Sequence, residues 1–190
     1  MTQLQQIKSI DGKHVVLRTV VEGDYSLLYA WRNDVESLFL WSISRRLVSF
    51  TEYTRSLGQS DIDVWLMIID KQQNIPIGFV YTYDVKSWDR HAFLTMYITP
   101  SARGKKIGLE AGALFVQYLM DYFPFIKLYA DVFELNPISH SFVSTYGFVQ
   151  EGFFPSHRYY KGKEWGMYRL ALYRDAWESR KDEVFAKITG

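Results

Sequence analysis

The sequence contains no cysteine, and this absence removes several classes of chemistry at once. Disulfide bonds, thiol nucleophiles, thiolate zinc sites and iron–sulfur clusters all need cysteine sulfur, so any covalent chemistry must use other groups. An excess of charge of one sign is also lacking, because 22 Lys and Arg residues face 21 Asp and Glu residues, for a formal net charge of +1. A domain that binds a nucleic-acid backbone usually carries a clear basic excess, so nucleic acid is not the expected partner.

Long hydrophobic runs are missing as well. Uninterrupted apolar runs such as residues 65–69 are far shorter than the roughly 20 residues that a membrane helix needs. Residues 1–10 lack the apolar core of a secretory signal peptide. We therefore expect a cytoplasmic protein that does not interact with membranes.

Aromatic residues, in contrast, are abundant and make up 17% of the chain, as 6 Trp, 14 Tyr and 13 Phe. Most are expected to fill a core, and others are suited to line a flat pocket for a small organic ligand. No repeat, low-complexity segment or flexible linker divides the chain, so we expect one domain over residues 1–190. Exposed aromatic edges are compatible with a homodimer.

The order of the predicted elements indicates an α+β domain. Runs rich in β-branched and aromatic residues predict strands at 14–20, 64–69, 75–84, 91–99, 126–133, 148–154 and 165–173. Capping residues, among them Asp24 and Ser49, and helical periodicity predict helices at 24–31, 49–57, 105–123, 136–147 and from 175 onward. A strand, helix, strand order implies parallel pairing of 91–99 with 126–133. We expect a mixed, mostly antiparallel sheet of about seven strands with four to five helices.

The segment 100–111 joins a predicted strand to the start of the longest predicted helix, and it gathers two glycines and three cations. Unpaired N–H groups at a helix start carry partial positive charge, and glycine lets a ligand approach the backbone closely. The pattern predicts a pyrophosphate ligand. The alternative is a solvated loop whose glycines serve only the turn.

Three motifs resemble those of the GCN5-related N-acetyltransferase (GNAT) superfamily. Residues 103–108, Arg-Gly-Lys-Lys-Ile-Gly, are similar to its Gln/Arg-x-x-Gly-x-Gly/Ala acetyl-coenzyme A loop. Residues 136–139, Asn-Pro-Ile-Ser, followed by Tyr-Gly-Phe at 146–148, are similar to its Asn-x-x-Ser/Ala helix and Gly-Phe terminus. Residues 151–152 and 170–177 resemble the branch that acetylates ribosomal-protein N-termini and polyamines. The resemblance covers residues 13–178.

This resemblance implies a GNAT-like fold with a V-shaped splay between 91–99 and 126–133, through which the pantetheine arm of acetyl-coenzyme A (acetyl-CoA) passes. Ile98 would offer backbone hydrogen bonds near the thioester, and Asn136 would contact the pantetheine arm. Lys106 stands where the family has its middle glycine, a change that a phosphate site tolerates if the backbone avoids a positive φ. The implied pyrophosphate ligands are Arg103, Gly104, Lys105, Lys106, Ile107, Gly108 and Leu109.

The resemblance also implies an enzyme that moves an acetyl group by direct attack of a primary amine. Val143 stands where many members have the Tyr that protonates the departing thiolate. Ser139, four residues earlier on the same helix face, is the candidate donor, and Tyr146 is the alternative. Phe93 stands where the family often has a glutamate base. His91 is the candidate base, with Asp84 and Glu134 as alternatives.

The acceptor stays open at this point. Arg32 and Trp41 lie in a stretch that resembles the acetyltransferases of nucleotide-linked amino sugars, where Arg32 would pair with a phosphate and Trp41 would stack on a sugar or base. The alternative is a helix cap and a core tryptophan. The other histidines have no metal-ligand spacing, so no metal is expected.

Three functions follow from these observations. The first is an acetyl-CoA-dependent N-acetyltransferase acting on an amino sugar, a nucleotide-linked amino sugar or a polyamine, with a protein N-terminus as the alternative acceptor. The second is a catalytically silent coenzyme A-binding module. The third is a nucleotide-binding interaction domain that uses the cationic loop alone.

Overall fold

The computed structural model describes residues 9–41, 46–57, 62–103 and 106–189, and these residues form a sheet of eight strands. The spatial order is β1-β2-β3-β4-β5-β6-β8-β7, and every neighbouring pair is antiparallel except β5 and β6. The strands are β1 (Ser9–Asp11), β2 (Val15–Thr19), β3 (Trp65–Asp70), β4 (Ile75–Lys86), β5 (His91–Ile98), β6 (Lys127–Phe133), β7 (Val149–Tyr160) and β8 (Lys163–Tyr173).

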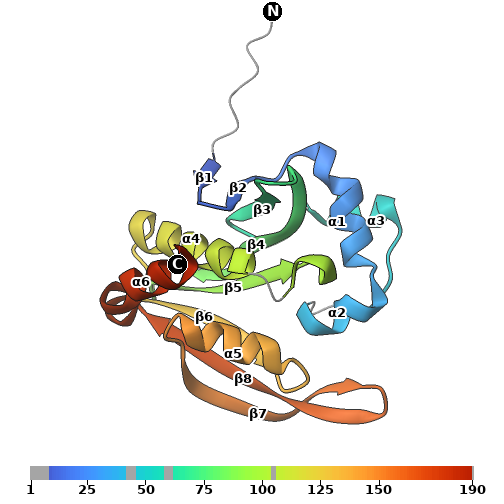
Figure 1. Ribbon diagram of the computed structural model, residues 1–190. Helices are drawn as coiled ribbons and strands as arrows, with labels where there is room; N and C mark the ends of the chain where they lie inside the picture. Colours follow the sequence, from blue (N-terminus) through green and yellow to red (C-terminus); the bar gives the residue numbers. More distant parts are fainter. Residues whose placement is uncertain (1–8, 42–45, 58–61, 104–105, 190) are drawn as a thin grey trace, which may run out of the picture.

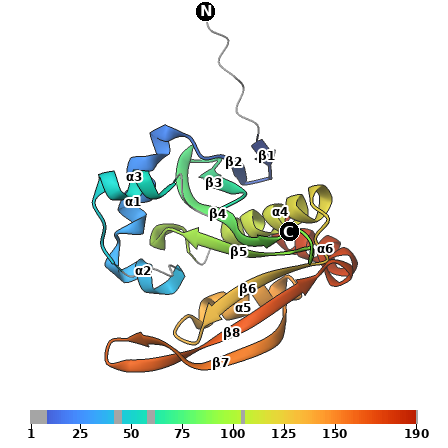
Figure 2. The same ribbon diagram turned by 180° about the vertical axis from the view of Figure 1, so that it is seen from behind.

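Helices cover both faces of the sheet (Figures 1 and 2). On one face lie α4 (Lys106–Tyr122), α5 (Pro137–Thr145) and α6 (Arg174–Thr189). On the other face, over the β3 and β4 half, lie α1 (Tyr25–Arg32) and α3 (Phe50–Leu57), with α2 (Val35–Trp41) nearby. Single 3-10 turns, Glu22–Asp24 and Pro100–Ala102, precede α1 and α4.

The alternation of side chains along the strands produces two separate cores. Val80, Leu128 and Leu172 point to the face covered by α4, α5 and α6 and are at most 1% exposed. Met67, Phe79 and Tyr97 point to the opposite face and pack against α1 and α3. That second core is mostly aromatic, which is where much of the chain's aromatic content is used.

Most of the predicted elements are present. The short β1 was missed because three residues show no pattern, and β7 continues six residues beyond the predicted end at residue 154. The predicted Ser49 cap of α3 is confirmed, because its Oγ accepts from the Glu52 N–H at 3.2 Å. The predicted Asp24 cap of α1 is wrong. Its carboxylate instead accepts from the Arg18 guanidinium at 2.7 and 2.8 Å and from the Val21 N–H.

The two parallel strands separate, as the resemblance implied. β5 pairs with β6 only where residues 91–93 face residues 127–129. Beyond that point β5 stays paired to β4 and β6 stays paired to β8, so residues 94–98 and 130–133 diverge. The main-chain groups along these inner edges therefore face a gap in the sheet rather than another strand.

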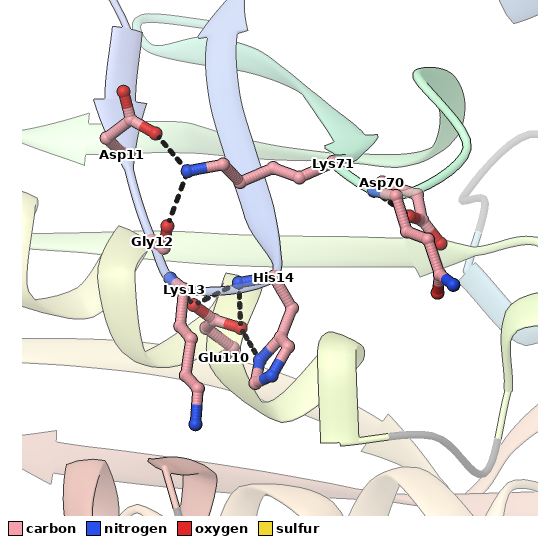
Figure 3. A network of polar contacts seen from close by, with 8 residues as sticks. Asp11, Gly12, Lys13, His14, Asp70, Lys71 and Glu110 are labelled. Atoms are coloured by element: carbon pink, nitrogen blue, oxygen red, sulfur yellow. Dashed lines mark hydrogen bonds and ion pairs between the residues drawn. The ribbon is translucent and has the colours of Figure 1, made fainter.

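A buried carboxylate fixes α4 to the turn between β1 and β2 (Figure 3). Glu110 is 2% exposed, and its carboxylate accepts hydrogen bonds from the N–H groups of Lys13 and His14 and lies 2.8 Å from His14 Nδ1. A Cβ on Gly12 would overlap this carboxylate, so the turn requires glycine there. The Lys71 ammonium donates to Asp11 at 2.7 Å and closes the network.

Candidate functional site

A cavity of about 740 Å³ occupies the place where β5 and β6 separate. Strand alternation divides its lining into two halves. The helix-side half is formed by residues of α4 and α5 with the end of β5: Ile98, Arg103, Lys106, Gly108, Leu109, Asn136, Ser139, Val143 and Tyr146. The open-face half lies on the other side of the sheet: Tyr83, Thr95, Asp131, Phe133, His157, Arg158, Met167 and Arg169.

The start of α4 brings the predicted pyrophosphate segment to the cavity. Lys106 is exposed and begins the helix, and the first turn of α4 contains no acidic residue. Gly108 is buried, and a Cβ there would lie 3.7 Å from Ile98 Cγ1, so α4 packs closely on the end of β5. Leu109 lines the cavity, whereas Ile107 packs against the core behind it. Gly104 and Lys105 lie outside the described residues.

Arg103 connects this segment to its surroundings. Its Nε donates to the Ile98 carbonyl at 3.1 Å, and its Nη2 lies 3.4 Å from Ser37 Oγ in α2. The carbonyl of Ile98 therefore already accepts a hydrogen bond from within the chain. Arg103 remains exposed and lines the cavity, so its charge contributes to the positive potential at the start of α4.

The amino end of α5 places the second motif. Asn136 caps the helix, since its Oδ1 accepts from the Ser139 N–H at 3.2 Å, and Pro137 follows at the first helical position. Ser139 and Val143 lie one turn apart and both line the cavity, as their spacing predicts. Asn136 also lines the cavity, beside its capping role.

Tyr146 follows α5 and is 2% exposed. Its hydroxyl donates to the Leu109 carbonyl at 2.9 Å and so connects α5 to α4. Burial raises the pKa of Tyr146 well above its usual value, which keeps the phenol protonated.

The three base candidates named from the sequence do not line the cavity. The His91 ring stands edge-on to Tyr129, with the ring centroids 5.3 Å apart. Asp84 pairs with Lys86 at 2.5 Å, and Glu134 accepts from the Gly166 N–H. The histidine that does line the cavity is His157, whose exposed ring stacks on Phe133 at 6.3 Å.

The charged groups of the open-face half were missed by sequence reasoning. Asp131 and Arg169 stand opposite each other on β6 and β8 and form a two-pronged ion pair at 2.9 and 2.8 Å. The hydrogen bond to Asp131 raises the pKa of Arg169. Burial, together with the nearby Asp131 charge, raises the pKa of Tyr83, so its phenol stays neutral. Strand alternation predicts that the side chain at an odd-numbered position points away from the even-numbered core positions, and this was the signal in the sequence for both residues. The register of β6 with β8 is what brings the two side chains together.

The residues proposed for the acceptor lie elsewhere or outside the described part. Arg32 is half-buried at the end of α1 and does not line the cavity. Burial lowers the pKa of Arg32, while the neighbouring Tyr53 and Tyr81 phenols oppose that effect. The side chain of Trp41, at the end of α2, lies outside the described residues.

A second hollow of about 460 Å³ lies beside the end of α4, lined in part by Arg90, Tyr173 and Arg174. The Arg174 guanidinium donates to the carbonyls of Met120, Phe123 and Phe125. It thereby satisfies the carboxyl end of α4, which is a structural role.

The described residues contain no group of three or more His, Cys, Asp or Glu side chains that could hold a metal ion. None of the described helices is long and apolar enough to cross a membrane.

The family description "Acetyltransferase (GNAT) domain" matches residues 14–149, which include the splayed strands, the start of α4 and α5. The chain belongs to the GNAT acetyltransferase family. It is therefore an acetyltransferase, and the resemblance found in its motifs is confirmed. No curated protein matches the sequence at a significant level.

Solved structures share the fold at low sequence identity. A spermidine N-acetyltransferase from Vibrio cholerae, solved with CoA and spermine, has a TM-score of 0.79 at 20% identity, over 88% of this chain and 99% of that one. A GCN5-related N-acetyltransferase from Brucella melitensis has a TM-score of 0.77 at 21% identity, over 96% and 86%. RimL, a ribosomal L7/L12 alpha-N-protein acetyltransferase in complex with CoA, has a TM-score of 0.77 at 15% identity, over 89% and 99%.

Proposed function

We propose that this GNAT protein transfers the acetyl group of acetyl-CoA to a primary amine by direct attack. The observation that carries the proposal is the single cavity at the splay, which runs from the start of α4 to the opposite face of the sheet. A thioester that enters from the helix side and an amine that enters from the open face would meet inside it. Proximity of this kind converts a reaction between two molecules into one within a complex.

The residues of the helix-side half fit coenzyme A. The free N–H groups of the first turn of α4 and the charges of Arg103 and Lys106 suit a pyrophosphate. Gly108 leaves room for it, because a side chain there would extend from a buried position in the cavity wall. The inner edge of β5 near Ile98 and the side chain of Asn136 suit the amides of the pantetheine arm. When bound, acetyl-CoA supplies the activated acetyl group.

The chain must then supply two proton transfers. The departing thiolate needs a proton, and Ser139 lines the cavity at the amino end of α5, where its hydroxyl is suited to donate one. Tyr146 is the second candidate, but its hydroxyl proton already goes to the Leu109 carbonyl. The amine must lose a proton before it attacks. His91 would act through water from outside the cavity, whereas the His157 imidazole reaches the open-face half directly.

The acceptor class is a small amine, an amino sugar, a nucleotide-linked amino sugar or a polyamine, with a protein N-terminus as the alternative. The solved neighbours whose names state an acceptor act on spermidine and on a ribosomal protein. A catalytically silent coenzyme A-binding module is the second candidate function, because Val143 and Phe93 occupy the family's usual donor and base positions.

The test is release of free thiol from acetyl-CoA, measured with polyamines, amino sugars, nucleotide-linked amino sugars and peptides that start with Ala or Ser. A calorimetric titration with coenzyme A runs beside it. Thiol release that depends on one acceptor class supports the transferase and names its acceptor. Binding of coenzyme A without release by any acceptor supports the silent module, and absence of binding refutes both.

A further inference from the structure

The open-face half of the cavity has a charge balance that suits an anion better than a polycation. Among the described residues that line the whole cavity, Asp131 contributes the one carboxylate, and Arg169 neutralises it through two hydrogen bonds. Arg158 adds a positive charge beside this pair, with His157 next to it. A polyamine carries several ammonium groups at neutral pH, since alkyl amines ionise with a pKa near about 10. Such a ligand needs carboxylates that this half of the cavity does not offer.

The β7–β8 hairpin is built to bring Arg158 into the cavity. The turn end of this hairpin extends beyond the end of β6, so residues 163–165 of β8 pair only with β7. Between Phe154 and Arg158 the register shifts, so that three residues of β7 oppose Gly166 alone. Ser156 within this bulge has a φ of 51°, in the left-handed region. A bulge of this kind bends the strand and redirects the side chains that follow it.

As a result, Arg158 is 4% exposed although it lies on an edge strand that is mostly exposed. The centre of its guanidinium lies 3.4 Å from the ring centroid of Phe133, at the end of β6. A guanidinium stacked on an aromatic face keeps its N–H donors in the plane of the group, where they match carboxylate or phosphate oxygens. Arg158 lines the cavity, so an anionic group bound there would lie within reach of its guanidinium.

We propose that Arg158 binds an anionic group, a carboxylate or a phosphate, carried by the acceptor amine, so that the enzyme selects anionic amines over polyamines. Phe133 and Asp131 are two residues apart on one face of β6, so the anion site and the carboxylate beside the splay are separated by about 6.6 Å along the strand. An acceptor that spans this spacing would place its anion on Arg158 and its amine near Asp131, where the strands diverge. The inference rests on the proposed function, which assigns the cavity to acetyl-CoA and the acceptor amine.

The experiment uses matched acceptors that differ in charge. Glucosamine 6-phosphate is compared with glucosamine for the phosphate, β-alanine with β-alanine amide for the carboxylate, and spermidine serves as the polycation. We expect kcat/KM to be about 10- to 100-fold higher for at least one anionic member than for its neutral partner, as one to two charge-assisted hydrogen bonds provide. Spermidine should be the poorest acceptor.

The variants isolate the charge of Arg158. Arg158→Met should remove the preference, because it lowers kcat/KM for the anionic member far more than for its neutral partner, while Arg158→Lys should restore part of the preference. Arg55→Met, which removes an exposed cation on α3 outside the cavity, is the matched control and should change none of these values. Preferred turnover of spermidine, or a preference that survives in Arg158→Met, would overturn the proposal.

Binding separates this inference from the proposed function. The same acceptors are titrated calorimetrically into the protein saturated with coenzyme A. If an anionic member binds in an Arg158-dependent manner but no acceptor is acetylated, the anion site stands and the transferase assignment fails. If amines are acetylated without regard to charge, the transferase stands and the anion site fails. If no anionic member binds more tightly than its neutral partner, the anion site is refuted.

Discussion

Replacement of Glu110 with alanine is expected to lower the free energy of unfolding by about 2 to 5 kcal/mol. The carboxylate is 2% exposed, and it accepts from two main-chain N–H groups in the turn before β2, those of Lys13 and His14. Each donor left unsatisfied costs about 1 to 3 kcal/mol, reduced here because the turn is only half-buried. Glu110→Gln keeps one oxygen acceptor and should cost about half as much.

A double-mutant cycle with Gly12 tests the same reasoning more strictly. In the wild-type protein Gly12→Ala would place a methyl group onto the Glu110 carboxylate and within 2.6 Å of Leu114 Cδ1, so it should destabilise strongly. In the Glu110→Ala background the first overlap is gone, and the remaining close contacts are the flexible leucine side chain and the Val15 carbonyl oxygen, 3.0 Å from the added Cβ. The two substitutions should therefore couple by more than about 1 kcal/mol.

The measurement is urea-induced unfolding followed by tryptophan fluorescence. The free energies of unfolding are compared between variants whose m-values agree with that of the wild-type protein. A loss smaller than about 1 kcal/mol in Glu110→Ala would refute the account of α4 as anchored through this carboxylate. Purely additive effects in the cycle would refute the steric part.

Three further outcomes are expected. Gly108→Trp should weaken coenzyme A binding by about 100-fold or more, because it blocks two or more charge-assisted contacts to the pyrophosphate. Gly108→Ala should fold normally, since its Cβ meets nothing closer than 3.7 Å. Calorimetric titration of both variants with coenzyme A measures the two affinities. Ser139→Ala should lower kcat by about 10- to 100-fold with little change in the affinity for acetyl-CoA, and wild-type turnover would remove Ser139 from the mechanism. Burial would raise the pKa of Asp24, but hydrogen bonds from Arg18 and Val21 outweigh it and lower that pKa. The stability that Asp24 contributes is thus present above its unfolded pKa of about 3.9 and lost progressively as the pH falls through its lower folded-state pKa. Asp24→Asn should therefore destabilise at pH 7, and the loss should shrink as the pH is lowered below about 3.9 in unfolding experiments.

Local physical rules were enough to predict the parts of this protein that depend on neighbouring residues. The Asn136-Pro137 start and the Gly147 end of α5 follow from capping and from a φ of 96°, which glycine alone adopts easily. The long amphipathic pattern predicted α4, and the strand, helix, strand order around it predicted the parallel pair β5 and β6. The motifs at 103–108 and 136–139 stand at the starts of α4 and α5, so the proposed coenzyme side of the site could be predicted from the sequence.

The acceptor side could not be predicted, because its residues come from strands whose register is set over long range. Asp131 meets Arg169 only through the pairing of β6 with β8, residues 38 positions apart in the chain. Arg158 reaches Phe133 only because a bulge bends β7. Pro155 indicates an interruption of the strand pairing near Ser156, but it does not predict which side chain the bulge turns towards β6. A shift of one residue in either strand would turn these side chains to the other face. The sequence alone thus determined the family and predicted the helix-side half of the cavity, and the tertiary structure determined which charges line the half proposed for the acceptor.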